Sequence, residues 1–236
     1  ALILLAAVIA CGAAQAAEKD YLIVNEAAPI FGLDDKALRA SWKEDFPNIQ
    51  RYYMFQIWPK SCAMGINGSD NRLREVQRTM LQYFSNLSVM STLGVKPPGG
   101  CHFPAEGYGE FAKMLSPIIN YQIYHRYQDG PLTPPNLKRA FYSNDRRDEL
   151  TLEFDQNVNW SDKLVSEFYL DDQSGHVESG SANASSITLK LKRPSLATKI
   201  TYLDSERWHE DNLLHGQTGL AALTFCDVPI ENAESP

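Results

Sequence analysis

The chain has 236 residues, of which 44% are hydrophobic and 22% charged, so it can form one or two globular domains with buried cores. Its formal net charge of -7 and its few basic clusters exclude a nucleic-acid-binding face, because phosphate binding needs a concentrated basic surface. The 5 histidines and 4 cysteines show no metal-ligand spacing, and we expect neither a metal nor a cofactor.

The first residues have the features of an export signal. Ala1 to Ala10 form an apolar run too short to span a bilayer, and Ala14-Gln15-Ala16 offers a cleavage site. Residues 1–17 are therefore a predicted signal segment, and the protein is expected to be secreted or periplasmic. The sequence Val8-Ile9-Ala10-Cys11 also fits a bacterial lipoprotein box, which would attach a lipid anchor to Cys11 and place the protein in the outer membrane. A buried strand or helix is the remaining interpretation.

Residues 18–128 alternate between predicted strands and helices. The strands, each a short apolar run, are Tyr21–Val24, Arg51–Trp58 and Leu87–Ser91. The helices, each with apolar residues at helical spacing, are Lys36–Phe46, Arg72–Phe84 and Pro104–Tyr127. This alternation predicts a doubly wound parallel sheet, and three strands are fewer than the roughly five of a stable open sheet. We therefore expect a partial α/β domain whose exposed edge favours self-association or needs a missing N-terminal partner segment.

A Pro- and Gly-rich linker, 129–136, precedes a second predicted domain, 137–236. The predicted strands of this domain are Arg139–Tyr142, Leu150–Phe154, Val165–Leu170, Ile187–Leu191, Lys199–Leu203 and Ala221–Phe225. Their spacing predicts a small antiparallel β-sandwich. The Ser-, Ala- and Gly-rich run Ser179–Ser186 is a predicted loop, and Cys226 a predicted buried free thiol.

His102 lies in the Gly- and Pro-rich stretch between the third predicted strand and the third predicted helix. Loops at the carboxyl ends of parallel strands converge on one edge of the sheet, and imidazole titrates near neutrality. His102 is therefore a candidate general base, with a surface histidine of no role as the alternative. Cys62 and Cys101 follow predicted parallel strands, so we expect a disulfide between them that restricts the loop of His102.

Several segments resemble SGNH-type carbohydrate esterases of the sialate O-acetylesterase kind. They are Ser41–Asn48, Phe55–Pro59, Leu73–Arg78, Gly99–Pro104 and Gly107-Tyr108, and the resemblance covers roughly Tyr21 to Tyr127. It implies part of a flavodoxin-like three-layer SGNH hydrolase sheet, trailed by a β-sandwich domain. It also implies hydrolysis of O-acetyl esters on an acetylated carbohydrate substrate through a serine nucleophile, with His102 as the catalytic base.

The chain departs from this family pattern at the other site positions. Asn25 and Glu26 fall where the family carries the segment whose side-chain amide binds the oxyanion, so either is a candidate oxyanion residue, with strand-end capping as the alternative. Gly99 stands where the family has an aspartate that orients the imidazole. Ser69 follows no predicted strand and is interpreted as a helix-start or loop residue, so no nucleophile segment is found.

The sequence therefore predicts a secreted carbohydrate esterase-like protein, truncated before its nucleophile segment. A non-catalytic secreted glycan-binding module is the alternative, and a purely structural envelope protein a third. Trp160, Trp208 and His209 are candidates for an aromatic sugar-stacking face, although a position in the core is the favoured interpretation.

Overall fold

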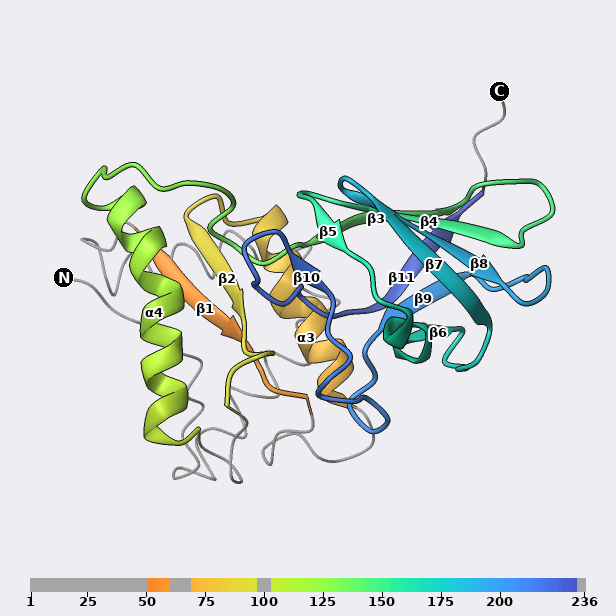
Figure 1. The fold of residues 1–236 in the computed structure, drawn as a ribbon, viewed down its shortest axis with the longest axis horizontal. Helices are drawn as coiled ribbons and strands as arrows, with labels where there is room; N and C mark the ends of the chain where they lie inside the picture. Colours follow the sequence, from red (N-terminus) through yellow and green to blue (C-terminus); the bar gives the residue numbers. More distant parts are fainter. Residues whose placement is uncertain (1–50, 60–68, 97–102, 233–236) are drawn as a thin grey trace.

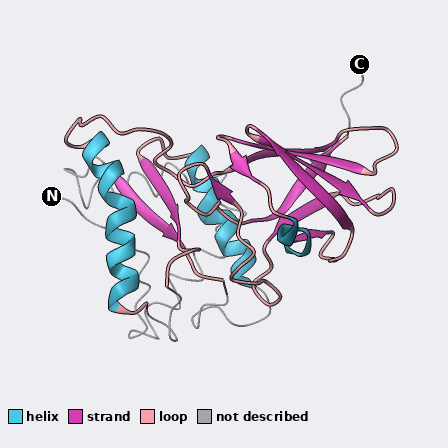
Figure 2. Cartoon of the chain, in the orientation of Figure 1, coloured by secondary structure: helices cyan, strands magenta, loops and turns pink. Residues whose placement is uncertain are grey.

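The structure, a computed structural model, describes residues 51–59, 69–96 and 103–232 (Figure 1). The described part is mixed α/β. One long helix and a two-stranded parallel sheet lie at one end of the molecule, a seven-stranded sheet lies at the other, and a second helix lies between the two sheets (Figure 2). Within these ranges, no helix is long and apolar enough to cross a membrane.

The parallel pair consists of β1 (Tyr52–Gln56) and β2 (Leu87–Ser91), in register from Tyr52 opposite Leu87 to Gln56 opposite Ser91. Between them the chain forms α3 (Ser69–Thr79) and the 3-10 turn η1 (Met80–Gln82). Both strands are short apolar runs with nearly every side chain buried, which is the pattern of a sheet covered on both faces. The predicted parallel pairing of these two segments is confirmed.

Helix α4 (Ala105–Gln122) covers one face of this pair. Phe111, Leu115 and Ile118 pack against Tyr53 and Phe55, and the Phe55 and Phe111 ring centroids are 4.5 Å apart. Met54 points to the opposite face, as alternate strand residues do, and there it packs with Val89 and Leu223. The helix ends before its predicted end at Tyr127, because His125 adopts a left-handed φ of 52° that no α-helix continues.

The large sheet has the strand order β6-β9-β11-β3-β4-β8-β7. Its strands are β3 (Leu137–Tyr142), β4 (Glu149–Phe154), β6 (Phe168–Leu170), β7 (Val177–Asn183), β8 (Ser186–Leu191), β9 (Lys199–Tyr202) and β11 (Phe225–Glu231). A small separate pair joins β5 (Val158–Asn159) to β10 (His215–Gly216).

Strand β11 changes partners along its length. Phe225 and Val228 pair with β9 in the antiparallel sense, whereas Ile230 pairs with Ala140 of β3 in the parallel sense. A bulge at Asp227, whose φ is 55°, interrupts the pairing with β9 before the pairing with β3 begins. The prediction of a purely antiparallel sandwich is therefore wrong at this pair, because β11 enters the sheet alongside β3 in the same direction.

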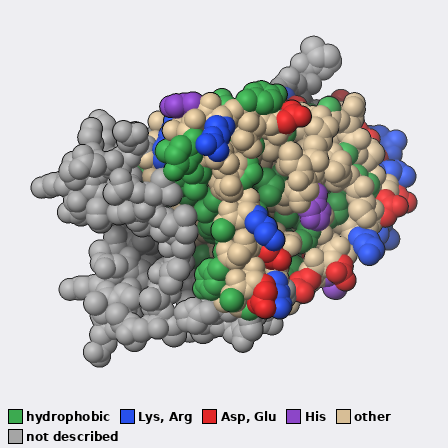
Figure 3. Space-filling model, turned by 60° about the vertical axis from the view of Figure 1, so that its left-hand side comes forward, with side chains coloured by type: hydrophobic (Ala, Val, Ile, Leu, Met, Phe, Trp, Pro, Cys, Tyr) green, Lys and Arg blue, Asp and Glu red, His purple; other side chains and the backbone are tan. Residues whose placement is uncertain are grey.

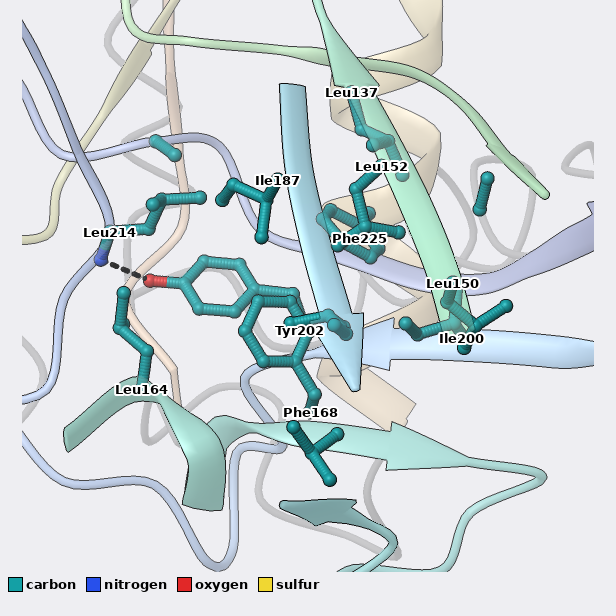
Figure 4. Packing of buried hydrophobic residues seen from close by; sticks show 14 of the residues in the cluster. Leu137, Leu150, Leu152, Leu164, Phe168, Ile187, Ile200, Tyr202, Leu214 and Phe225 are labelled. Carbon is teal, nitrogen blue, oxygen red and sulfur yellow. Dashed lines mark hydrogen bonds between the residues drawn. The ribbon is translucent and has the colours of Figure 1, made fainter. Parts of the chain in front are cut away.

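The core of the strand-rich half lies between side chains of β3, β4 and β8 and those of β6, β9 and β11 (Figure 4). Tyr202 lies at its centre, with ring centroids 5.3 Å from Phe168 and 5.6 Å from Phe225. Its buried hydroxyl accepts a hydrogen bond of 2.7 Å from the Leu214 amide. The strict alternation of buried and half-exposed residues along β4 matches the alternation expected from its sequence.

Several predicted segments in this half differ from the structure. The strand predicted at Ala221–Phe225 begins only at Phe225 and continues to Glu231 as β11. Most of the predicted loop Ser179–Ser186 is strand, because β7 pairs along its length with β8. Val165 to Glu167 belong to the 3-10 helix η2 (Asp162–Glu167) and not to a strand. The predicted linker packs on its surroundings, since the Thr133 carbonyl accepts a hydrogen bond from Gln156 and the Pro135 carbonyl accepts one from the Leu223 amide.

Figure 3 shows how hydrophobic and charged side chains are distributed on one face of the molecule. Hydrophobic side chains gather beside the residues that are not described, and acidic and basic side chains are interspersed at the opposite end. On this face the charges of the described surface are therefore mixed and form no large basic patch.

Candidate active site

The carboxyl ends of β1 and β2 form an edge at which three parts of the chain meet. Trp58 follows β1, the turn from Thr92 to Lys96 follows β2, and α4 begins nearby. The Thr92 hydroxyl donates a hydrogen bond of 2.8 Å to the Gln56 carbonyl, which ties the two strand ends together. Side chains on loops that leave such an edge converge, which is why open α/β sheets place ligands there.

The start of α4 is fixed to the turn after β2. The Lys96 amide donates to Glu110 Oε2 at 2.7 Å, and Lys96 Nζ lies 3.7 Å from Glu106 Oε2. A side chain at Gly107 would have its Cβ 3.3 Å from both the Lys96 carbonyl oxygen and the Phe103 side chain, so glycine permits this close approach. The hydrogen bond from its own amide and the charge of Lys96 lower the pKa of Glu106, which lies in the first helical turn.

An aromatic cluster lines this edge. The Trp58 ring lies 5.8 Å from Phe103 and 5.2 Å from Trp208, both in edge-to-face geometry. Phe103 also contacts Phe111 of α4 at 4.8 Å. These contacts fix Phe103, which follows His102 directly in the sequence, and they connect the edge to the strand-rich half through Trp208.

The residues predicted from the sequence to form the site lie outside the described residues. They are the base His102, the oxyanion candidates Asn25 and Glu26, the cysteines Cys62 and Cys101, and the lipoprotein cysteine Cys11. Ser69 begins α3, in agreement with its interpretation as a helix-start residue. Within the described ranges, no group of histidine, cysteine and acidic side chains is arranged to hold a metal ion.

Cys226 is a buried free thiol, as predicted. It lies in β11, and its exposed fraction is 8%. Burial raises the pKa of this thiol to about 11, and the nearby Asp227 carboxylate adds to the effect. The Cys226 thiol therefore stays protonated at neutral pH, and the protonated thiol is not the nucleophilic form.

Trp160, Trp208 and His209 do not form one aromatic face, since each packs on a different partner. Trp160 stacks on Phe168 with centroids 6.1 Å apart, and Trp208 packs on Trp58. His209 Nδ1 lies 2.9 Å from the buried carboxylate of Glu167. The structure thus agrees with the favoured interpretation for the two tryptophans, both of which are half-buried against the core.

Sequence reasoning missed a buried polar network behind the site. Arg74 of α3 is 1% exposed, and its guanidinium donates to the hydroxyls of Thr224 and Ser205 at 2.9 and 3.1 Å. It also donates to Asn71 Oδ1 at 2.7 Å and lies 3.5 Å from Asp70. Burial lowers the pKa of Arg74 to about 10, which leaves it charged at neutral pH.

Gln56, the last residue of β1, belongs to the same network. Its amide nitrogen donates to the carbonyls of Arg74 and Thr224 at 2.9 and 3.0 Å, and its oxygen accepts from the Thr224 amide at 2.9 Å. The network therefore connects β1, α3 and the strand-rich half beneath the edge. The one signal for it in the sequence is the run of polar residues on α3, where an apolar stripe alone would suffice for packing.

Together these features define a mixed α/β protein with parallel strand ends that converge on an aromatic-lined edge, beside a large mixed sheet. No family model matches the chain, and no curated protein is similar to it in sequence. A solved structure of a carbohydrate acetylesterase from Xanthomonas citri has the same fold over 78% of this chain, with a TM-score of 0.61 and 16% sequence identity. The chain spans 42% of the length of that structure.

Proposed function

We propose that the protein is a carbohydrate esterase that hydrolyses O-acetyl esters on sugars, with His102 as the general base. The observation that supports this most strongly is the fold shared with a carbohydrate acetylesterase. Phe103, which follows His102 directly in the sequence, packs on Trp58 at the carboxyl edge of the parallel strands, and this also supports the proposal.

In this chemistry a serine hydroxyl attacks the acetyl carbonyl while the imidazole takes its proton. The proton then passes to the sugar oxygen as the ester bond breaks, and water releases acetate from the acylated serine by the same route. Gly99 supplies no carboxylate to orient the imidazole, and Glu110 already accepts a hydrogen bond from the Lys96 amide. Without an orienting carboxylate, His102 is expected to be a weaker base that still supports some catalysis, as in catalytic triads that lack their acidic residue.

In this mechanism the serine nucleophile lies outside the described residues. Within those residues, no serine hydroxyl is hydrogen-bonded to a histidine ring. A serine from another segment of the polypeptide or from a partner chain would complete the pair, and Asn25 or Glu26 would assist at the oxyanion. The export-signal features of residues 1–17 support a location outside the cytoplasm, where a Cys62–Cys101 disulfide is able to persist.

The test uses protein purified from its native cells, so that any further segment or partner is retained. Acetate release is measured with acetylated xylo-oligosaccharides and with acetylated oligogalacturonates. A fluorophosphonate probe, which labels activated serines, is mapped by mass spectrometry. We expect acetate release that the probe abolishes and an adduct on one serine. Folded protein that releases no acetate and takes up no probe would contradict the proposal.

A second candidate function is glycan binding without catalysis. The observation in its favour is the same absence of a serine–histidine pair from the described residues. It predicts that acetylated oligosaccharides bind to the purified protein but are recovered intact, and that replacement of His102 by Ala leaves their affinity unchanged.

A further inference from the structure

An open groove of about 700 Å³ lies on the strand-rich half. It runs between η2, β6, the turn at Ser174 and Gly175, and the segment from Arg207 to Asn212. None of its lining residues comes from β1, β2 or α4, so it is separate from the candidate active site. Its volume is in the range of pockets that hold small-molecule ligands.

Basic side chains predominate in this groove. Lys163, Lys192 and Arg207 line it, and Asp162 is its one carboxylate. Asp162 accepts a hydrogen bond of 3.0 Å from the Trp160 indole. Lys163 and Lys192 are exposed, and in the described part of the chain their ammonium groups form no ion pair. Among the described residues, Lys163 and Lys192 are therefore unpaired cations at the groove, on a protein whose formal net charge is -7, whereas the charge of Arg207 is partly balanced by Asp204.

Arg207 is held in place before any ligand arrives. Its Nε donates to Asp204 Oδ1 at 3.2 Å, and its guanidinium carbon lies 4.5 Å from the centre of the buried Tyr169 ring. The same residue donates to the Asp172 carbonyl at 3.3 Å. A stacked, hydrogen-bonded guanidinium loses less conformational entropy when it binds an anion than a free one does.

A buried carboxylate fixes the polar wall of the groove. Glu167 is 0% exposed, and its Oε1 accepts hydrogen bonds from Ser166 Oγ at 2.8 Å and Asn212 Nδ2 at 3.0 Å. His209 Nδ1 lies 2.9 Å from the same oxygen, while 64% of its side chain is exposed. Three side chains that line the groove are thus anchored on one group, and each keeps further hydrogen-bonding capacity.

We propose that this groove binds an acidic oligosaccharide, a sugar chain that carries carboxylates. The cations match the carboxylates, the anchored serine, asparagine and histidine match sugar hydroxyls, and the partly exposed Val165 supplies apolar surface for a ring face. The groove is open, as the passage of a chain of sugars requires. This inference rests on the proposed function, because it makes the bound chain the non-reacting part of the esterase substrate.

The segment that carries Arg207 and His209 also reaches the candidate active site. Trp208, between them, packs on Trp58, and Trp58 packs on Phe103 beside His102 in sequence. The groove and the aromatic cluster are therefore connected through three consecutive residues, 207–209. Binding energy gained at such a distance can position the reacting acetyl group.

The test measures binding and not hydrolysis. Oligogalacturonate binding is followed by isothermal titration calorimetry for the wild type and for the exposed-lysine variant Lys163→Glu/Lys192→Glu. The control, Lys113→Glu/Lys138→Glu, makes the same change in net charge at exposed lysines outside the groove. We expect the groove variant to bind at least about tenfold more weakly, which corresponds to about 1.4 kcal/mol, and the control to bind within about twofold of the wild type.

Two further ligands make the result specific. Neutral xylo-oligosaccharides of the same length should bind the wild type much more weakly, and affinity for oligogalacturonate should fall as salt rises, because exposed charges are screened. An equal loss of oligogalacturonate affinity in the groove variant and the control variant would overturn the proposal. So would a wild-type affinity for neutral chains, or for dextran sulfate, equal to that for oligogalacturonate. If oligogalacturonate binds in the groove and no acetate is released, the esterase proposal alone fails. If acetate is released and oligogalacturonate does not bind, the groove proposal alone fails.

Discussion

Gly180 and Gly109 both lie inside regular elements, yet their surroundings differ. A Cβ on Gly180 of β7 would lie 2.4 Å from the Trp160 ring, which is fixed by stacking on Phe168. A Cβ on Gly109 of α4 would meet nothing within 4 Å. The glycine in β7 is therefore required by contact with an indole, and the one in α4 is not.

We expect Gly180→Ala to destabilise the protein by about 1–3 kcal/mol through overpacking, and Gly109→Ala to stabilise it by about 1 kcal/mol through helix propensity. Urea unfolding of both variants against the wild type measures this difference. Adding Trp160→Ala to Gly180→Ala should recover part of the loss, and a Gly180→Ala variant as stable as the wild type would disprove the contact.

Cys226 gives a pH dependence whose sign follows from its raised pKa. The folded protein holds the thiol proton up to about pH 11, whereas the unfolded chain releases it near pH 9. The contribution of the protonated Cys226 thiol to the free energy of unfolding is thus fully present below the pKa of the unfolded chain. It is lost as pH rises from there through the pKa of the folded protein. In Cys226→Ala, stability measured by urea unfolding should decline less between pH 8 and 10 than in the wild type, and identical declines would contradict the assignment.

Helix α3 turns a charged face toward the strand-rich half, and this is its main structural role. Arg74 binds Thr224 and Ser205, and Arg78 donates to Asn136 and to the Leu137 carbonyl at 2.9 and 2.8 Å. Glu75, the partner of Arg78, also accepts from the Cys226 amide at 3.1 Å. The helix therefore joins the β1–β2 pair to β3 and β11 by hydrogen bonds rather than by an apolar stripe alone.

Replacing Arg74 by Met should cost about 3–5 kcal/mol, because Asp70 and several hydroxyls would stay buried without their cation. The matched control is Arg72→Met, an exposed arginine on the same helix, which should change the free energy of unfolding by less than about 0.5 kcal/mol. Similar values for the two variants, measured by urea unfolding, would show that the network adds nothing to stability.

These elements also show which parts of the structure the sequence could predict. Local apolar patterns identified β1, β2, α3, α4 and most strands of the large sheet, because burial on one or both faces leaves a periodic trace. The parallel pairing of β11 with β3 and the partners of Arg74 depend on segments far apart in the chain, and no local pattern encodes them. The end of α4 was missed because a left-handed histidine has no strong sequence signal.

On the scale of the whole molecule, the two halves share one buried network and one aromatic cluster. Gln56 and Arg74 meet Thr224 beneath the edge, and Trp58 meets Trp208 beside it. The boundary predicted at 129–136 lies in sequence between two halves that pack together in space. We infer that the described part of the chain unfolds as a unit.

Urea unfolding followed by tryptophan fluorescence and by far-ultraviolet circular dichroism should therefore give coincident transitions, since coincidence of probes is the test of two-state behaviour. Two separated transitions, one for each half, would show that the network and the cluster are too weak to couple them.

The most direct test of the proposed function is acetate release by the native-source protein with His102→Ala, compared with His125→Asn. His125 is exposed at a left-handed position that asparagine tolerates, so its replacement controls for loss of a histidine as such. The account predicts that the rate falls by at least about 100-fold in His102→Ala and stays within about twofold in His125→Asn. Equal rates in the wild type and His102→Ala would contradict the role given to His102 and, with it, the proposed mechanism.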